Sequence, residues 1–170
     1  EPDGGFPHHH PDPTIVENMV DLQEAVLREG ADLGIAFDGD GDRIGAVDDT
    51  GQIIWGDEML TLCGLRVLED EPHARIIGEV KCSRVMYETL AAAGAEVDMW
   101  KVGHSFIKAR MKETGACLAG EMSGHIFFAD RAYGFDDAIY AGARLCELLA
   151  EDKVSLSDRM ANFPTMYATP

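Results

Sequence analysis

The sequence predicts an α/β protein: a three-layer α/β/α domain with a mostly parallel, mixed sheet, preceded by a truncated α/β domain. Two observations lead to this prediction. Segments of helical and of strand periodicity alternate regularly over residues 57–150, which is typical of layered α/β domains. Residues 1–55 hold one predicted helix and about three predicted strands, which is little for an independent core.

The helix of the first unit is predicted to follow a Pro-, Gly- and His-rich opening loop. Thr14 and Glu17 have the spacing of a capping box, and apolar residues at helical intervals continue until Gly30. Short apolar runs then predict strands at residues 33–37, 44–47 and 52–55. The segment "DDTG" at residues 48–51 predicts a hairpin turn between the last two strands.

The second unit is predicted at residues 56–164, and residues 165–170 are expected to begin a linker to a further domain. The change from hairpin-type to alternating patterns places the boundary near residues 55 and 56. Predicted helices cover residues 57–68, 83–93, 105–114 and 136–150. Predicted strands cover residues 75–80, 96–100, 117–119 and 126–128.

The composition excludes several classes of partner. The 170 residues carry a formal net charge of −17, which argues against binding to nucleic acid or to an anionic membrane surface. No apolar run approaches the roughly 20 residues of a membrane helix, and the polar opening does not resemble a secretory signal. We therefore expect a cytoplasmic protein whose four scattered cysteines stay reduced.

An acidic loop follows the first predicted strand. In "FDGDGDR", Asp38, Asp40 and Asp42 alternate with glycines, and Arg43 follows at once. Carboxylates this close repel one another unless a cation lies among them, and oxygen ligands of this kind suit Mg²⁺. An arginine beside the metal would suit a phosphate held on the same ion. The loop therefore predicts a magnesium site that also contacts phosphate.

Other interpretations of this loop fit less well. An EF-hand would require Gly at Arg43 and Glu at Asp49, and a dinucleotide fingerprint would require Gly at Ile44. A haloacid-dehalogenase-like phosphatase shares the D-x-D pattern but has Thr or Val where Asp42 stands. This phosphatase and a solvated acidic turn remain alternatives.

Five motifs in order resemble the α-D-phosphohexomutase superfamily over essentially the whole chain. They are "PHHHPDP", "FDGDGDR", "VKCSR", "KVGHS" and "GEMSGH", the last followed by "YGFDDAIYAGARL". The resemblance implies the latter part of that family's second domain and all of its third. It also implies that Asp38, Asp40 and Asp42 hold Mg²⁺.

The resemblance implies a reaction as well. Family members interconvert hexose 1-phosphate and hexose 6-phosphate, here of mannose or glucose, through a phosphoserine enzyme and a bisphosphorylated sugar that serves as intermediate and activator. The expected partners are therefore a sugar phosphate, a phosphoserine domain 1 and a phosphate-binding domain 4. A free-standing module that binds metal or sugar phosphate without chemistry remains the alternative.

The candidate site residues are spread along the chain. Arg43, Lys81 and His104 are expected in the catalytic machinery, with Lys81 and His104 also contacting the phosphate and hydroxyls of the substrate. Lys81 and His104 each follow a predicted strand, at the edge where α/β sheets bind ligands. Glu121 and Ser123 lie two residues apart, so in an extended loop both would face one way. By resemblance they bind the 3- and 4-hydroxyls of the sugar.

Three further residues or groups of residues bear on function. Met122 in "GEMSGH" is similar to the residue at this place in phosphomannomutases and in the dual-specificity members. His125 is expected to be structural, and Lys108 is expected to be solvated. The serines at positions 83, 105, 123, 155 and 157 do not lie in the family's T-A-S-H-N-P context. We therefore expect this chain by itself to lack the catalytic serine and mutase activity.

Overall fold

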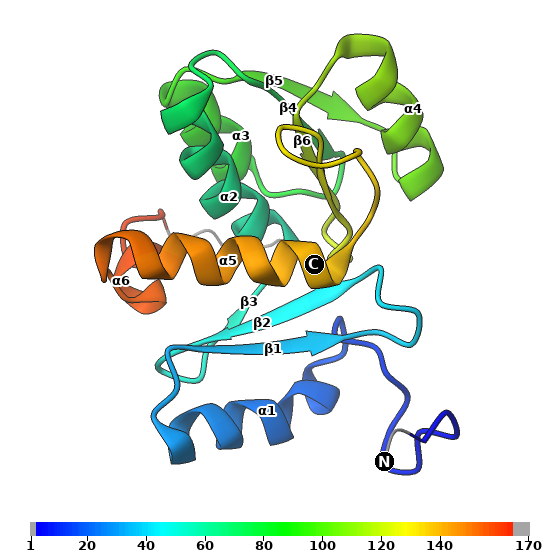
Figure 1. Cartoon of the computed structure of the whole chain (residues 1–170), viewed down its shortest axis with the longest axis vertical. Coiled ribbons are helices and arrows are strands. Elements are labelled where there is room, and N and C mark those ends of the chain that lie inside the picture. The colour runs from blue at the N-terminus through cyan, green and yellow to red at the C-terminus, as the bar shows by residue number, and fades with distance from the viewer. Residues whose placement is uncertain (1–2, 165–170) are drawn as a thin grey trace.

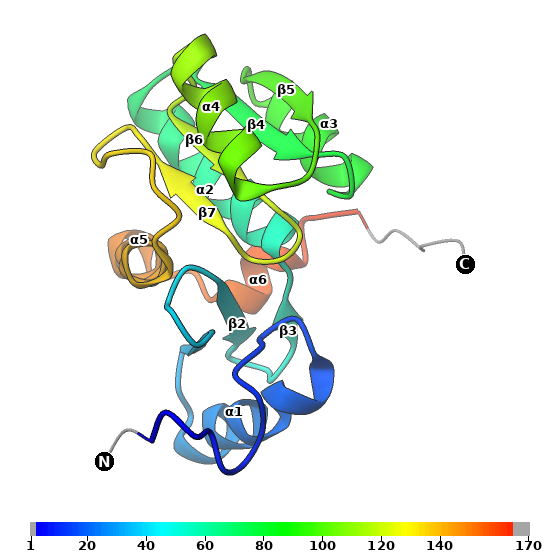
Figure 2. The same ribbon diagram turned by 90° about the vertical axis from the view of Figure 1, so that its right-hand side faces the viewer.

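The computed structural model describes residues 3–164, except for the side chain of Asp152. The chain forms two stacked units, and helices and strands alternate from α2 (Gly56–Asp70) to β6 (Leu118–Gly120) in the second (Figures 1 and 2). No helix within the described range is long and apolar enough to cross a membrane. The predicted linker at residues 165–170 lies outside that range. The elements are α1 Val16–Glu29, β1 Leu33–Phe37, β2 Ile44–Asp48, β3 Ile53–Ile54, α2 Gly56–Asp70, β4 Arg75–Glu79, α3 Arg84–Ala92, β5 Glu96–Trp100, α4 His104–Thr114, β6 Leu118–Gly120, β7 Ile126–Phe128, α5 Ala138–Asp152 and α6 Leu156–Met160.

The first unit is an antiparallel sheet in the order β1-β2-β3 with α1 on one face. Met19 and Val26 of α1 are buried against Val47 of β2. The helix ends at Gly30, whose φ of 63° gives the left-handed conformation that glycine favours. The predicted capping box is wrong, because α1 begins after Ile15 and the Thr14 hydroxyl donates to Asp12 at 2.7 Å instead.

The second unit is a sheet in the order β5-β4-β6-β7, with β4 parallel to β5 and β6, and β7 antiparallel to β6. This confirms the predicted mostly parallel, mixed sheet. Neighbouring residues of a strand face opposite sides, so Ile76 packs with Leu60 and Leu90 of α2 and α3, while Ile77 packs with Ile107 of α4. Helices on both faces complete the three predicted layers.

The two units share a core. Helix α5 packs against β1 and β2 on the face opposite α1, so the sheet of the first unit lies between α1 and α5 (Figure 1). Ile44 and Ala46 of β2 belong to the same buried cluster as Ala141 of α5 and Leu60 of α2. Residues 1–55 therefore bury the second face of their sheet against α5 of the second unit.

Two differences from the predicted elements bear on the site. Helix α5 begins at Ala138 rather than at residue 136, because the Asp137 carboxylate caps it by accepting the N–H of Tyr140 at 2.9 Å. Asp136 is thus left in the preceding loop. Helix α6 was not predicted, and Ser157 joins it to the β2–β3 turn by donating to Asp49 at 2.8 Å.

Candidate functional site

The predicted site residues meet where the two units touch. Strands β4, β5 and β6 are parallel, so the loops that follow them leave the same edge of the sheet. The acidic loop 38–43 reaches this edge through β2, whose Ile44 N–H donates to the Gly124 carbonyl at 3.1 Å. Arg43 and His125 form a backbone bridge beside this bond. The loops of both units therefore form one surface.

Asp38 organises the acidic loop. Its Oδ1 accepts the N–H groups of Gly41, Asp42 and Arg43 at 3.0 to 3.1 Å, and its Oδ2 accepts Arg43 Nε at 2.8 Å. Burial would raise the pKa of Asp38, but the hydrogen bonds from Arg43 hold it below its usual value. The carboxylate is therefore ionised at neutral pH and holds the loop in a tight turn.

The three aspartates of the acidic loop lie close together. Asp38, Asp40 and Asp42 each present a carboxylate oxygen within 4.8 Å of the others. Burial raises the pKa of Asp42, and the negative charges of Asp38 and Asp40 raise it further. An all-oxygen donor set of three close carboxylates fits a hard divalent cation such as Mg²⁺.

Arg43 is held at the edge of this cluster by two carboxylates. Besides the bond to Asp38, Nη1 lies 3.2 Å from Oδ1 of Asp12, which comes from the loop before α1. The side chain is three-quarters buried, with 25% of its surface exposed. The guanidinium is therefore fixed beside the acidic cluster, although it shares its donors with protein carboxylates.

Lys81 and His104 lie on neighbouring loops. Lys81 follows β4, is largely exposed, and has its ammonium 3.8 Å from Glu79 Oε1. His104 is the first residue of α4, after Gly103 with a φ of 123°. Its Nδ1 lies 2.7 Å from Oδ2 of Asp136, and its ring is half exposed. Both side chains are accessible from the edge of the sheet.

The loop at Glu121 and Ser123 differs from its predicted form. It is a tight turn, in which the Gly124 N–H donates to the Glu121 carbonyl at 3.0 Å, so the argument from an extended loop is wrong. The Glu121 carboxylate lies beneath the turn, where it accepts the Gly103 N–H at 2.6 Å, and only 3% of the side chain is exposed. Ser123 stays half-buried at the surface, with Oγ 3.0 Å from Nδ1 of His125.

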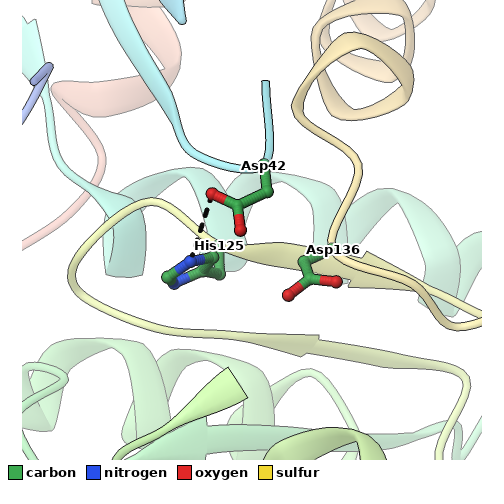
Figure 3. Close-up of side chains that lie close together, drawn as sticks. All are labelled: Asp42, His125 and Asp136. Carbon is green, nitrogen blue, oxygen red and sulfur yellow. Dashed lines mark ion pairs between the residues drawn. The ribbon is translucent and has the colours of Figure 1, made fainter. Parts of the chain in front are cut away.

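His125 lies at the centre of the site. Its Nδ1 is 3.1 Å from Oε2 of Glu121, and its Nε2 is 3.4 Å from Oδ1 of Asp42 (Figure 3). Burial would lower the pKa of His125, but the bond to Glu121 and the charge of Asp42 raise it above its usual value. The ring also stacks on that of His104, with centroids 5.5 Å apart. The structure thus places this residue between the acidic loop and the turn after β6.

Sequence reasoning missed Asp136 and expected Lys108 only to be solvated. Lys108, one helical turn after His104, lies 2.8 Å from Oδ1 of Asp136 and is not merely solvated. Burial opposes ionisation of Asp136, but the hydrogen bonds from Lys108 and His104 lower its pKa. A second group of possible metal ligands consists of Asp42, His125 and Asp136 (Figure 3). The Lys108 ammonium, however, already pairs with the Asp136 carboxylate and supplies a positive charge beside it. The two adjacent acidic residues in "FDDA" were the feature of the sequence that could have indicated Asp136 as a site residue.

Comparison with known proteins decides the family. Residues 55–167 match the phosphoglucomutase/phosphomannomutase α/β/α domain III family, and residues 1–51 match domain II. The chain belongs to this family.

The relatives of this chain are longer than it is. A phosphomannomutase/phosphoglucomutase of Pseudomonas aeruginosa is 52% identical over all 170 residues, which cover 37% of that protein. A phosphoglucomutase of Neisseria gonorrhoeae is 48% identical over the same length, again 37% of the relative. The crystal structure of a family member from Burkholderia thailandensis has a TM-score of 0.91 and 50% identity, covering 99% of this chain and 36% of that one. The chain therefore spans just over one third of these relatives.

Proposed function

We propose that this chain is the metal-binding and sugar-binding part of a phosphohexomutase that interconverts hexose 1-phosphate and hexose 6-phosphate of mannose or glucose. In this assignment residues 1–55 are the end of the second domain and residues 56–164 are the third. The observation that carries it is His125, which contacts Asp42 in the acidic loop and Glu121 in the turn after β6. A phosphate on the acidic loop and a sugar on the turn would thus share one site.

The acidic loop would hold magnesium through Asp38, Asp40 and Asp42. Bound there, Mg²⁺ would neutralise the charge of a phosphoserine presented by domain 1 and of the phosphoryl group being transferred. Arg43 would add a fixed positive charge to the same phosphate, since Asp12 and Asp38 hold its guanidinium beside the loop. The required serine and the second phosphate site belong to domains outside these residues.

The loops after β4, β5 and β6 would bind the sugar phosphate. Lys81 would contact a phosphate oxygen, and Ser123 and His104 would contact hydroxyls, because all three are accessible at one edge of the sheet. Glu121 would bind a hydroxyl only by exchanging its contact with His125 or Gly103 for one to the sugar. The bisphosphorylated intermediate would turn within this site between the two transfers.

His125 and His104 are the candidates for moving a proton. An imidazole titrates near neutrality, and the raised pKa of His125 favours the protonated ring there. His125 would hold this proton at Nε2 beside the acidic loop, where a hydroxyl reacts with a phosphoryl group. Asp136 contacts Nδ1 of His104 and so orients the ring, and Nε2 of His104 takes no part in this contact.

The phosphatase alternative fits the geometry less well. It would use Asp38 as the nucleophile, but both oxygens of that buried carboxylate accept hydrogen bonds from the loop and from Arg43. Mass spectrometry of trapped protein should accordingly find no phosphoaspartate at Asp38. A binding module without chemistry would bind sugar phosphate but show no turnover in any form of the protein.

The test measures conversion of mannose 1-phosphate and glucose 1-phosphate to the 6-phosphates. The enzyme that contains these residues together with a phosphoserine domain should convert at least one of them, and residues 1–170 alone should convert neither. Lys81→Ala should raise KM at least about tenfold, as expected for a lost charged phosphate contact. Lys112→Ala, at an exposed position of α4, is the control. No conversion by the complete enzyme would refute the proposal.

A further inference from the structure

Glu79, the last residue of β4, is a completely buried carboxylate at the sheet edge that carries the candidate site. Its neighbours in the strand, Ile76, Ile77 and Gly78, are buried as well. A carboxylate in such a place is costly unless charged hydrogen bonds compensate for its lost hydration. The hydrogen-bond partners of Glu79 therefore indicate its role.

The Glu79 carboxylate joins two site loops. Its Oε2 accepts the N–H of Lys81 at 2.8 Å, and its Oε1 accepts the N–H of Met122 at 3.2 Å. Strands β4 and β6 are paired in register from Ile76 with Leu118 to Gly78 with Gly120, which brings the two loops side by side. The same carboxylate lies 3.8 Å from the Lys81 ammonium.

We propose that Glu79 is a positioning residue for the sugar phosphate, and this inference rests on the proposed function. Its two hydrogen bonds set the separation between Lys81, the candidate phosphate contact, and the turn 121–125, the candidate sugar contact. A hexose phosphate held at both places spans this separation. A ligand held at Lys81 alone does not depend on it.

The second buried carboxylate of this edge extends the same arrangement. Glu121 accepts the Gly103 N–H, as described above, and so ties the turn after β6 to the loop before His104. Two carboxylates thus link the three loops that follow β4, β5 and β6. Glu79 is covered completely, so it positions the ligand without touching it.

The test is Glu79→Gln, which keeps the size of the side chain but replaces one of its two acceptor oxygens by a donor NH₂. In the complete enzyme, KM for the hexose 1-phosphate should rise about tenfold, equivalent to about 1.4 kcal/mol. The inhibition constant of inorganic phosphate should stay within about twofold or fall, because the variant also removes a negative charge beside Lys81. This divergence separates positioning from a general loss of structure.

Glu58→Gln is the matched control. Glu58 is a partly buried carboxylate that, like Glu79, accepts a backbone N–H, from Trp55 at 2.8 Å, but it joins no two site loops. Its variant should leave both constants unchanged. Equal changes in both constants for Glu79→Gln, or no change in either while the protein stays folded, would overturn the inference.

Amide hydrogen exchange provides a measurement that needs neither a variant nor activity. In the unmodified protein, the amides of Lys81 and Met122 should exchange slowly, because both donate to a buried carboxylate. Fast exchange at Met122 would overturn the inference even if the enzyme is active. Slow exchange in an enzyme without mutase activity would instead refute only the proposed function.

Discussion

His125 Nε2 lies 3.4 Å from Asp42 Oδ1, and this ion pair joins a turn of the second unit to a loop of the first. The two residues are far apart in the sequence, yet the backbone bridge between Arg43 and His125 brings them together. The candidate site therefore depends on the packing of both units.

Asp40→Asn should weaken divalent metal binding with little effect on folding, because Asp40 is exposed whereas Asp38 holds the loop together. Mg²⁺ at 100 times its Kd should add about 2.7 kcal/mol to the unfolding free energy of the unmodified protein and so raise its melting temperature. The rise should largely disappear in the variant. Asp32→Asn, at an exposed position before β1, should keep it. An equal rise in Asp40→Asn would contradict the assignment.

Gly124→Ala should separate the turn after β6 from β2. Gly124 has a φ of 95°, and a Cβ there would lie 2.4 Å from the carbonyl oxygen of Ile44. We expect a loss of about 3 kcal/mol in unfolding free energy, measured by urea denaturation. Gly115→Ala is the control, since Gly115 also has a positive φ but no atom within 4 Å of the added Cβ. It should cost about 1 kcal/mol. Similar losses in the two variants would argue against the close approach.

Asp130 should contribute stability that depends on pH. It pairs with buried Arg144 through two hydrogen-bonding contacts of 2.9 Å, and although burial would raise its pKa, the bonds from Arg144 lower it. Asp130→Asn should cost about 3 kcal/mol at pH 7, because it leaves Arg144 buried without this partner.

The sign of the pH dependence follows from the lowered pKa. The contribution of Asp130 is fully present above the unfolded pKa of about 3.9 and is lost as the pH falls through the folded value. The stability difference between the two proteins should thus be constant above about pH 5 and shrink below about pH 4. Asp21→Asn, at an exposed position of α1, is the control. A difference that does not shrink in acid would contradict the prediction.

The cysteines should differ in reactivity. Cys63, Cys82 and Cys117 are buried, and burial raises the pKa of each thiol, to about 12 for Cys63 and Cys82 and to about 11 for Cys117. Cys146 is exposed on α5. Iodoacetamide at pH 8 should therefore label Cys146 first, as mass spectrometry would show, and the other three only after unfolding. Rapid labelling of Cys82 in the native protein would contradict this burial.

Local sequence patterns predicted most elements because they reflect interactions within a few residues. Gly30 and Gly115 end α1 and α4 as expected, since each takes the left-handed conformation. The start of α5 was missed by two residues because Asp136 and Asp137 look alike in sequence. Only the structure shows that one caps the helix and the other contacts His104.

The sequence by itself determined the layered α/β class and the acidic loop, because apolar periodicity, glycines and clustered charges are local properties. The tertiary structure alone decided the role of residues whose partners are distant. His125 resembles an ordinary buried histidine until Asp42 and Glu121 lie beside it, and Glu79 resembles any strand-end acid until it binds two loops. Sequence distance carries no information about such contacts, because they form only when the sheet brings its loop ends together.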